Sequence, residues 1–91
     1  MKIAIQRKSP GEYLVTVEEA GSRTTHRVRV APDYAHKLTA GRVSEEELVR
    51  RSFEFLLARE PKEQILGTFD LRVIARYFPE YEREIREALG L

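Results

Sequence analysis

Cysteine, tryptophan and asparagine are all absent from this chain of 91 residues. Without cysteine it can form neither a disulfide nor a thiolate, which excludes a disulfide-stapled scaffold and cysteine-based catalysis. Its five glycines occur singly, so it has no glycine-rich loop of the kind that cradles phosphate groups. No apolar run approaches the roughly 20 residues of a membrane-spanning helix, and the apolar part of the N-terminus is too short for a signal peptide. We therefore expect a cytoplasmic protein.

The composition is typical of a folded and highly charged protein, with 42% hydrophobic and 34% charged residues. A chain of this length makes a single domain, 1–91, with a modest core. Arginine and glutamate dominate the charged residues and glutamine occurs only twice, a bias that suits a heat-adapted source, while the excess of arginine over lysine can also reflect codon usage. Residues 1–43 carry eight basic and four acidic side chains, a net of +4. Residues 44–91 carry eight basic and eleven acidic side chains, a net of −3. This asymmetry can steer a partner, or it can merely reflect opposite sides of one domain.

Three short segments of alternating polarity predict β-strands joined by tight turns. They are Lys2–Arg7, Tyr13–Glu18 and Arg23–Val30, with Pro-Gly and Ala-Gly turns between them. Because successive side chains of a strand point to opposite faces, each strand has one apolar and one polar face. The pattern predicts a three-stranded antiparallel meander with one buried and one solvated face.

The rest of the chain predicts helices. Tyr34–Ala40 follows a proline and ends at a glycine, and the longer Glu45–Arg59 begins at a capping box headed by Ser44. A single helical turn fits Pro61–Leu66. The fold class that follows is α+β, a three-stranded antiparallel meander followed by three to four helices packed on one face.

The C-terminal part carries a helical face interrupted by a proline. Its apolar residues recur at steps of three and four positions: Ile74, Phe78, Tyr81, Ile85 and Leu89. Proline inside a helix removes a backbone hydrogen bond and clashes with the preceding turn. We therefore expect the helix to break or kink near Phe78.

The helix predicted over Glu45–Arg59 is apolar over an unusually wide arc of roughly 200°. One contact with a sheet does not require such an arc, so the helix is either buried on two sides or in contact with another molecule. The second alternative gives the leading functional hypothesis, a non-catalytic protein-interaction module that forms a homodimer through Phe55, Leu48 and Ser52. On this hypothesis Phe55→Glu yields a folded monomer.

Candidate catalytic and metal-binding residues are few. His26 and His36 are the only histidines, and a zinc site would need carboxylates to supply its remaining ligands. His26 occupies an inward-facing strand position, which indicates a hydrogen-bonded core histidine. Asp33 and Asp70 precede predicted helices, where a carboxylate caps free N–H groups. We expect no enzymatic activity, no metal and no cofactor.

An alternative function comes from Thr25, Arg27 and Arg29, which alternate along one face of the third strand. The order of this strand, a short helix and the Ser44-capped helix resembles a ribbon-helix-helix domain over Thr24–Glu60. That resemblance implies a small DNA-binding regulator whose paired strands enter the major groove. Three features depart from the family: a short first helix, two preceding strands, and three glutamates, 45–47, where the family binds phosphate.

A second resemblance spans nearly the whole chain. Its pieces are Thr24–Val28, Ser52–Pro61, Ile65-Leu66, Phe69–Leu71, Ile74 and Tyr77–Glu82. In these pieces the chain resembles a set of short uncharacterised bacterial proteins. The resemblance implies a bacterial protein and brings no activity, ligand or functional residue with it.

Overall fold

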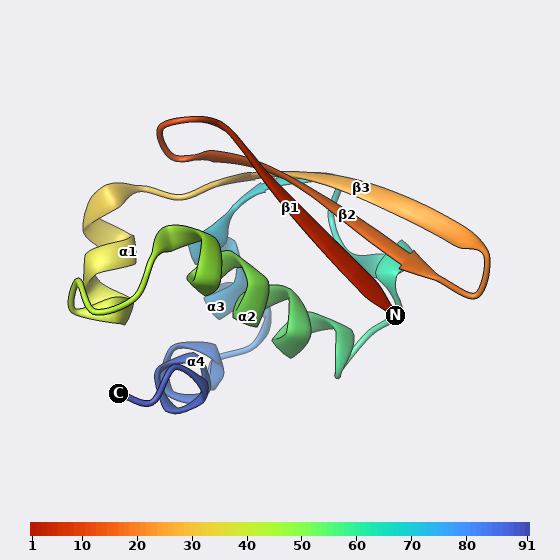
Figure 1. Ribbon diagram of the computed structural model, residues 1–91. Helices are drawn as coiled ribbons and strands as arrows, with labels where there is room; N and C mark the ends of the chain where they lie inside the picture. The colour runs from red at the N-terminus through yellow and green to blue at the C-terminus, as the bar shows by residue number, and fades with distance from the viewer.

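The N-terminal third of the chain forms the antiparallel meander that the alternating pattern predicts (Figure 1). The computed structural model describes all residues, 1–91. Its strands are β1 (Lys2–Ser9), β2 (Glu12–Glu19) and β3 (Ser22–Arg29). Ile5 lies opposite Val15, and Val15 lies opposite His26, so the inward-facing side chains of the three strands share one face. On that face Tyr13, Val15 and Val17 of β2 are buried.

A fourth strand completes the sheet and corrects the prediction of three antiparallel strands. β4 (Thr68–Asp70) lies parallel to β3, and the strand order is β1-β2-β3-β4. The sheet is therefore mixed. Phe69 is the only buried residue of β4, and one apolar side chain in three residues gives no alternating pattern from which a strand can be predicted. The α+β class itself is confirmed.

The helical segments agree with the predicted helices to within about two residues at their ends. They are α1 (Pro32–Thr39), α2 (Glu45–Leu57), the single turns η1 (Lys62–Gln64) and η2 (Leu71–Val73), α3 (Ile74–Tyr77) and α4 (Tyr81–Ala88). The Ser44 hydroxyl accepts a hydrogen bond of 3.1 Å from the Glu47 N–H, which confirms the predicted cap of α2. Asp70 accepts one of 3.1 Å from the Arg72 N–H and caps η2. No helix is both long enough and apolar enough to cross a membrane.

The C-terminal helix is broken at the proline. α3 ends at Tyr77, Phe78 leaves the helical region with φ −131° and ψ 89°, and α4 begins at Tyr81. Proline disfavours helical backbone in the residue before it, which explains the conformation of Phe78. The predicted break is therefore confirmed. The chain changes direction there, so α3 and α4 pack against different parts of the fold.

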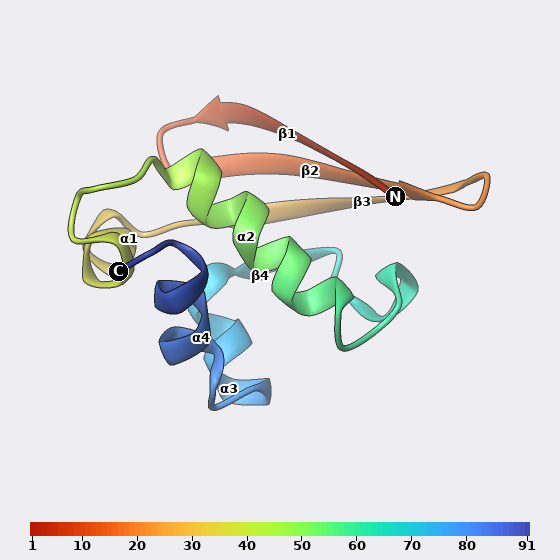
Figure 2. The same ribbon diagram turned by 60° about the horizontal axis from the view of Figure 1, so that its bottom comes forward.

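All helices lie on one face of the sheet, and the opposite face carries none (Figures 1 and 2). α2 contacts β1 on one side and α4 on the other. The wide apolar arc of α2 is thus buried on two sides within a single chain. This is the first of the two alternatives that the sequence left open.

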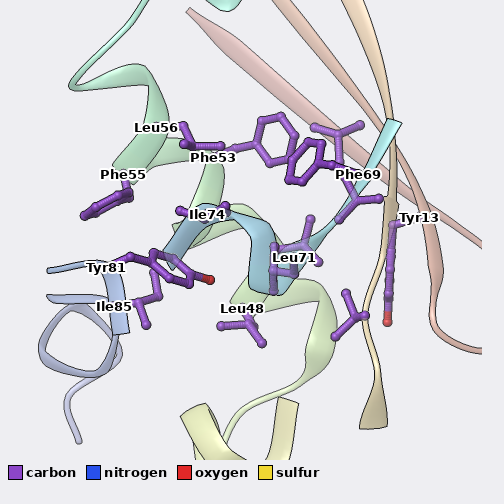
Figure 3. Packing of buried hydrophobic residues seen from close by; sticks show 14 of the residues in the cluster. Tyr13, Leu48, Phe53, Phe55, Leu56, Phe69, Leu71, Ile74, Tyr81 and Ile85 are labelled. Carbon is purple, nitrogen blue, oxygen red and sulfur yellow. The ribbon is translucent and has the colours of Figure 1, made fainter. Parts of the chain in front are cut away.

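Phe55, Leu48 and Ser52 belong to the core, which corrects their assignment to a homodimer interface. Leu48 and Ser52 are fully buried and Phe55 is 8% exposed. Phe55 meets Tyr81 of α4 at 5.2 Å between ring centroids (Figure 3). Ser52 donates to the Leu48 carbonyl at 2.7 Å and lies 2.7 Å from the Tyr81 hydroxyl, so its hydroxyl is already engaged inside the chain. The surface assigned to a second copy is occupied by α4.

Candidate functional site

The structure contains an apolar cleft on the helical side of the sheet. It has a volume of about 330 Å³ and lies between the C-terminal end of α2, the η1 turn, β4 and α3. Eight of its ten lining residues are hydrophobic. Six of these form its wall: Leu56, Ile65, Phe69, Val73, Ile74 and Phe78. Figure 3 shows Leu56, Phe69 and Ile74, which come from three different elements. The cleft therefore forms only in the folded chain.

Two large apolar side chains at the cleft are exposed to solvent. Leu66 is 48% exposed and Tyr77 is 68% exposed. Apart from Met1, no other large hydrophobic residue is exposed to this extent. Single exposed apolar residues are common, but Leu66 and Tyr77 line the same apolar cleft, which makes this cleft the candidate binding surface.

The position of Leu66 depends on His26, which is buried in β3. The Leu66 carbonyl lies 2.9 Å from His26 Nδ1, and the Thr24 hydroxyl lies 2.9 Å from Nε2. Because a carbonyl only accepts, Nδ1 carries a proton and donates it to the Leu66 carbonyl. The predicted core histidine is confirmed. The Gly67 carbonyl also accepts a hydrogen bond of 2.7 Å from the Arg27 N–H. Together, this bond and the bond from His26 hold the backbone at Leu66 in place.

Tyr77 owes its exposure to the short α3 helix. Ile74 at the start of α3 is buried, and Phe78 beyond its end packs edge-on against Phe55 at 5.8 Å. These two contacts fix α3 against the core on both sides of Tyr77. The Pro79 break then turns the chain away, so α4 does not cover the Tyr77 ring. The helical repeat that predicted the core residues gave no signal for the cleft, because Tyr77 lies outside that repeat.

Two charged side chains of residues 51–91 have no partner within the chain. Between residues 51 and 91, all but two of the charged side chains form an ion pair or donate to a backbone carbonyl. The exceptions are Glu60, which lines the cleft, and Arg76, which directly precedes Tyr77. The half-buried Glu60 carboxylate is thus an unpaired charge in the cleft lining, whereas Arg76 is exposed on α3 and does not line the cleft.

Thr25, Arg27 and Arg29 come together, as predicted, on the open face of the sheet. Arg29 forms an ion pair of 3.1 Å with Glu12. A hydrogen bond from Ser9, together with the positive charge of Arg29, lowers the pKa of the Glu12 carboxyl. Arg27 has no carboxylate partner. β3 is paired with β2 along its whole length and with β4 at Arg27–Arg29, so beside the two arginines no edge is free for the strand of a second copy.

Titratable groups elsewhere join separate elements of the fold. The Tyr13 hydroxyl donates to Glu45 at 2.9 Å, and burial together with this bond raises the pKa of Tyr13 to about 12. The Tyr34 hydroxyl donates to Glu82 at 2.7 Å, and this bond lowers the pKa of the Glu82 carboxyl. His36 is exposed on α1. No group of three or more histidines or carboxylates could hold a metal ion.

Comparison with known proteins gives no relative. No protein-family model matches the chain, and neither a curated protein nor a solved structure shows significant similarity to it.

Proposed function

We propose that this chain is a non-catalytic protein-interaction module that binds its partner through the apolar cleft. The observation that carries the proposal is the pair of exposed side chains, Leu66 and Tyr77, beside a cleft lined mainly by hydrophobic residues. Burial of apolar surface contributes about 25 cal/mol per Å², and tyrosine is among the residues that contribute most at interfaces. The two side chains gain this free energy only when another molecule covers them.

The lining favours apolar side chains over a small polar substrate. Glu60 and Gln64 are its only non-hydrophobic residues. Specific recognition of a polar metabolite needs several convergent polar groups, whereas an apolar anchor needs a hydrophobic pocket with a polar rim. We place the module in the cytoplasm of a heat-adapted bacterium, as its composition and its resemblance predict.

Photo-crosslinking in living cells tests this function. We expect a benzophenone amino acid at position 77 to crosslink to protein, because the Tyr77 ring lies within the contact. The same amino acid at position 19, at the exposed end of β2, is the matched control and should give no such product. The readout is the mass of the product on a denaturing gel. Equal labelling at the two positions, or none at position 77, contradicts the proposal.

Nucleic-acid binding is a second candidate because Thr25, Arg27 and Arg29 form a row on the uncovered face of the sheet. We expect any such binding to weaken steeply as salt increases, because phosphate contacts release counterions. The double variant Arg27→Ala/Arg29→Ala should then lose most of the affinity for duplex DNA, measured by fluorescence anisotropy at two salt concentrations. Unchanged DNA binding by this variant would exclude the sheet face. Binding that does not change with salt contradicts a phosphate contact.

A further inference from the structure

We infer that a hollow on the open face of the sheet binds the phosphate group of a small phosphorylated molecule. The hollow is formed by β2, β3, β4 and the end of β1, and its volume of about 490 Å³ suits a ligand of that size. Five of its ten lining residues are charged: Lys8, Glu12, Arg27, Arg29 and Asp70. It shares only the buried Phe69 with the apolar cleft, so this inference goes beyond the proposed function.

The two carboxylates of the hollow are already paired within the chain. Glu12 accepts a hydrogen bond of 2.8 Å from the Ser9 hydroxyl and forms an ion pair of 3.1 Å with Arg29. Asp70 accepts a hydrogen bond of 3.1 Å from the Arg72 N–H, and its carboxylate lies 3.4 Å from Arg72 Nε. The negative charges of the hollow are therefore compensated by their own partners and leave the remaining basic groups unbalanced.

Lys8 and Arg27 are these remaining basic groups. Both are exposed, and neither side chain forms an ion pair or a hydrogen bond within the chain. Two positive charges at one hollow repel each other, and a multiply charged oxyanion bound between them replaces this repulsion by attraction. A phosphomonoester carries a charge of about −1.5 to −2 at neutral pH, which matches the two unpaired positive charges.

The register of the sheet places Arg27 in the middle of the hollow. Leu14 of β2 lies directly opposite Arg27 on one side, and Thr68 of β4 lies opposite it on the other. A guanidinium can bind two oxygens of one phosphate group at once, and the neighbouring Thr68 hydroxyl can donate a further hydrogen bond. Leu14 is half-buried and offers an apolar surface to the uncharged part of the ligand.

Lys8 lines the hollow at a bulge in β1. The pairing of β1 with β2 passes from Arg7 opposite Tyr13 to Ser9 opposite Glu12, so Lys8 is an extra residue without a partner across the sheet. Bulges redirect a side chain and are frequent beside functional sites. This irregularity adds the compact charge of a lysine ammonium to the fork of Arg27.

Titration with inorganic phosphate tests the site. We expect saturable chemical-shift changes at Lys8, Arg27 and Thr68 in amide NMR spectra, recorded at constant ionic strength so that general charge screening does not change. Lys8→Ala and Arg27→Ala should each weaken binding at least about tenfold, because each removes a charge-assisted contact. Arg27→Lys should retain part of the affinity, since lysine keeps the charge and loses the two-pronged geometry.

Two exposed residues outside the hollow provide matched controls. Lys2 lies at the other end of β1, opposite Glu18, so Lys2→Ala removes the same charge from the same strand. Thr25 belongs to the row proposed for duplex DNA but does not line the hollow. Lys2→Ala and Thr25→Ala should both bind phosphate like the unmodified chain.

The outcomes decide between a discrete phosphate site and a general attraction for anions. Saturable binding that is lost in Lys8→Ala and Arg27→Ala but kept in both controls supports the site, as does competition by glycerol phosphate, a soluble phosphomonoester. Shifts that do not saturate, or that persist in Arg27→Ala, overturn it. Binding only to vesicles of phosphatidic acid, or only to duplex DNA, overturns the small molecule as the ligand. Far-ultraviolet circular dichroism of each variant verifies that the fold is retained.

Discussion

Phe55→Glu is expected to unfold the protein. Phe55 is 8% exposed and packs edge-on against Tyr81 (Figure 3) and Phe78. The Arg59 guanidinium lies 3.5 Å from its ring centroid. Truncating a buried phenylalanine costs about 3–5 kcal/mol, and burying a carboxylate adds a desolvation cost that pairing with Arg59 offsets only in part. A domain of this size has a free energy of unfolding of only about 5–15 kcal/mol. The substitution therefore removes most or all of the stability.

Circular dichroism and urea denaturation of Phe55→Glu measure this loss. Phe55→Leu is the matched control, since it keeps an apolar side chain and should cost less than about 2 kcal/mol. A folded Phe55→Glu monomer would contradict the packing described above and would return Phe55 to the surface.

Gly11→Ala is expected to be the most damaging substitution of a turn residue. Gly11 has φ +75°, and a Cβ at this position would lie 2.8 Å from the Val30 carbonyl oxygen. The Gly11 carbonyl also accepts a hydrogen bond of 2.8 Å from the Val30 N–H, so the turn cannot move away without losing that bond. Left-handed backbone costs an alanine about 1–2 kcal/mol, and steric crowding adds about 1–3 kcal/mol. We expect a total loss of roughly 2–5 kcal/mol in the free energy of unfolding.

Gly21→Ala separates the two contributions. Gly21 has nearly the same backbone angle, φ +77°, but a Cβ there would meet nothing within 4 Å. Its substitution should cost only the backbone contribution, about 1–2 kcal/mol. Urea denaturation of the two variants gives the difference directly. Equal losses would show that the approach of Gly11 to Val30 is unimportant.

Most of the secondary structure could be predicted from local patterns. The meander follows from alternation, the start of α2 from Ser44, and the break before α4 from Pro79. Each of these features depends on residues that are neighbours in the chain, so the sequence displays its cause directly. The same holds for His26, whose inward position follows from the parity of β3.

The features that were missed depend on residues far apart in the chain. β4 forms through pairing of Gly67 and Thr68 with Arg27 of β3. Its three residues are too few to show an alternating pattern. The wide apolar arc of α2 predicted a second contact, but nothing in the sequence showed whether α4 or another molecule would make it. The cleft likewise forms from four separate elements. The repeat of apolar residues gave no sign of the cleft, because Tyr77 lies outside that repeat.

The parallel pairing of β3 with β4 has a consequence for synthesis on the ribosome. Thr68 follows its partner Arg27 by about forty residues, and both helices α1 and α2 lie between them. Until this late segment emerges, β3 has a bare edge and its apolar face lacks Phe69 and Leu71. Contacts of such long range cost chain entropy before they stabilise the fold. The growing chain should therefore stay incompletely folded, and its exposed β3 edge should need protection from other nascent chains, until nearly all of the domain has been made.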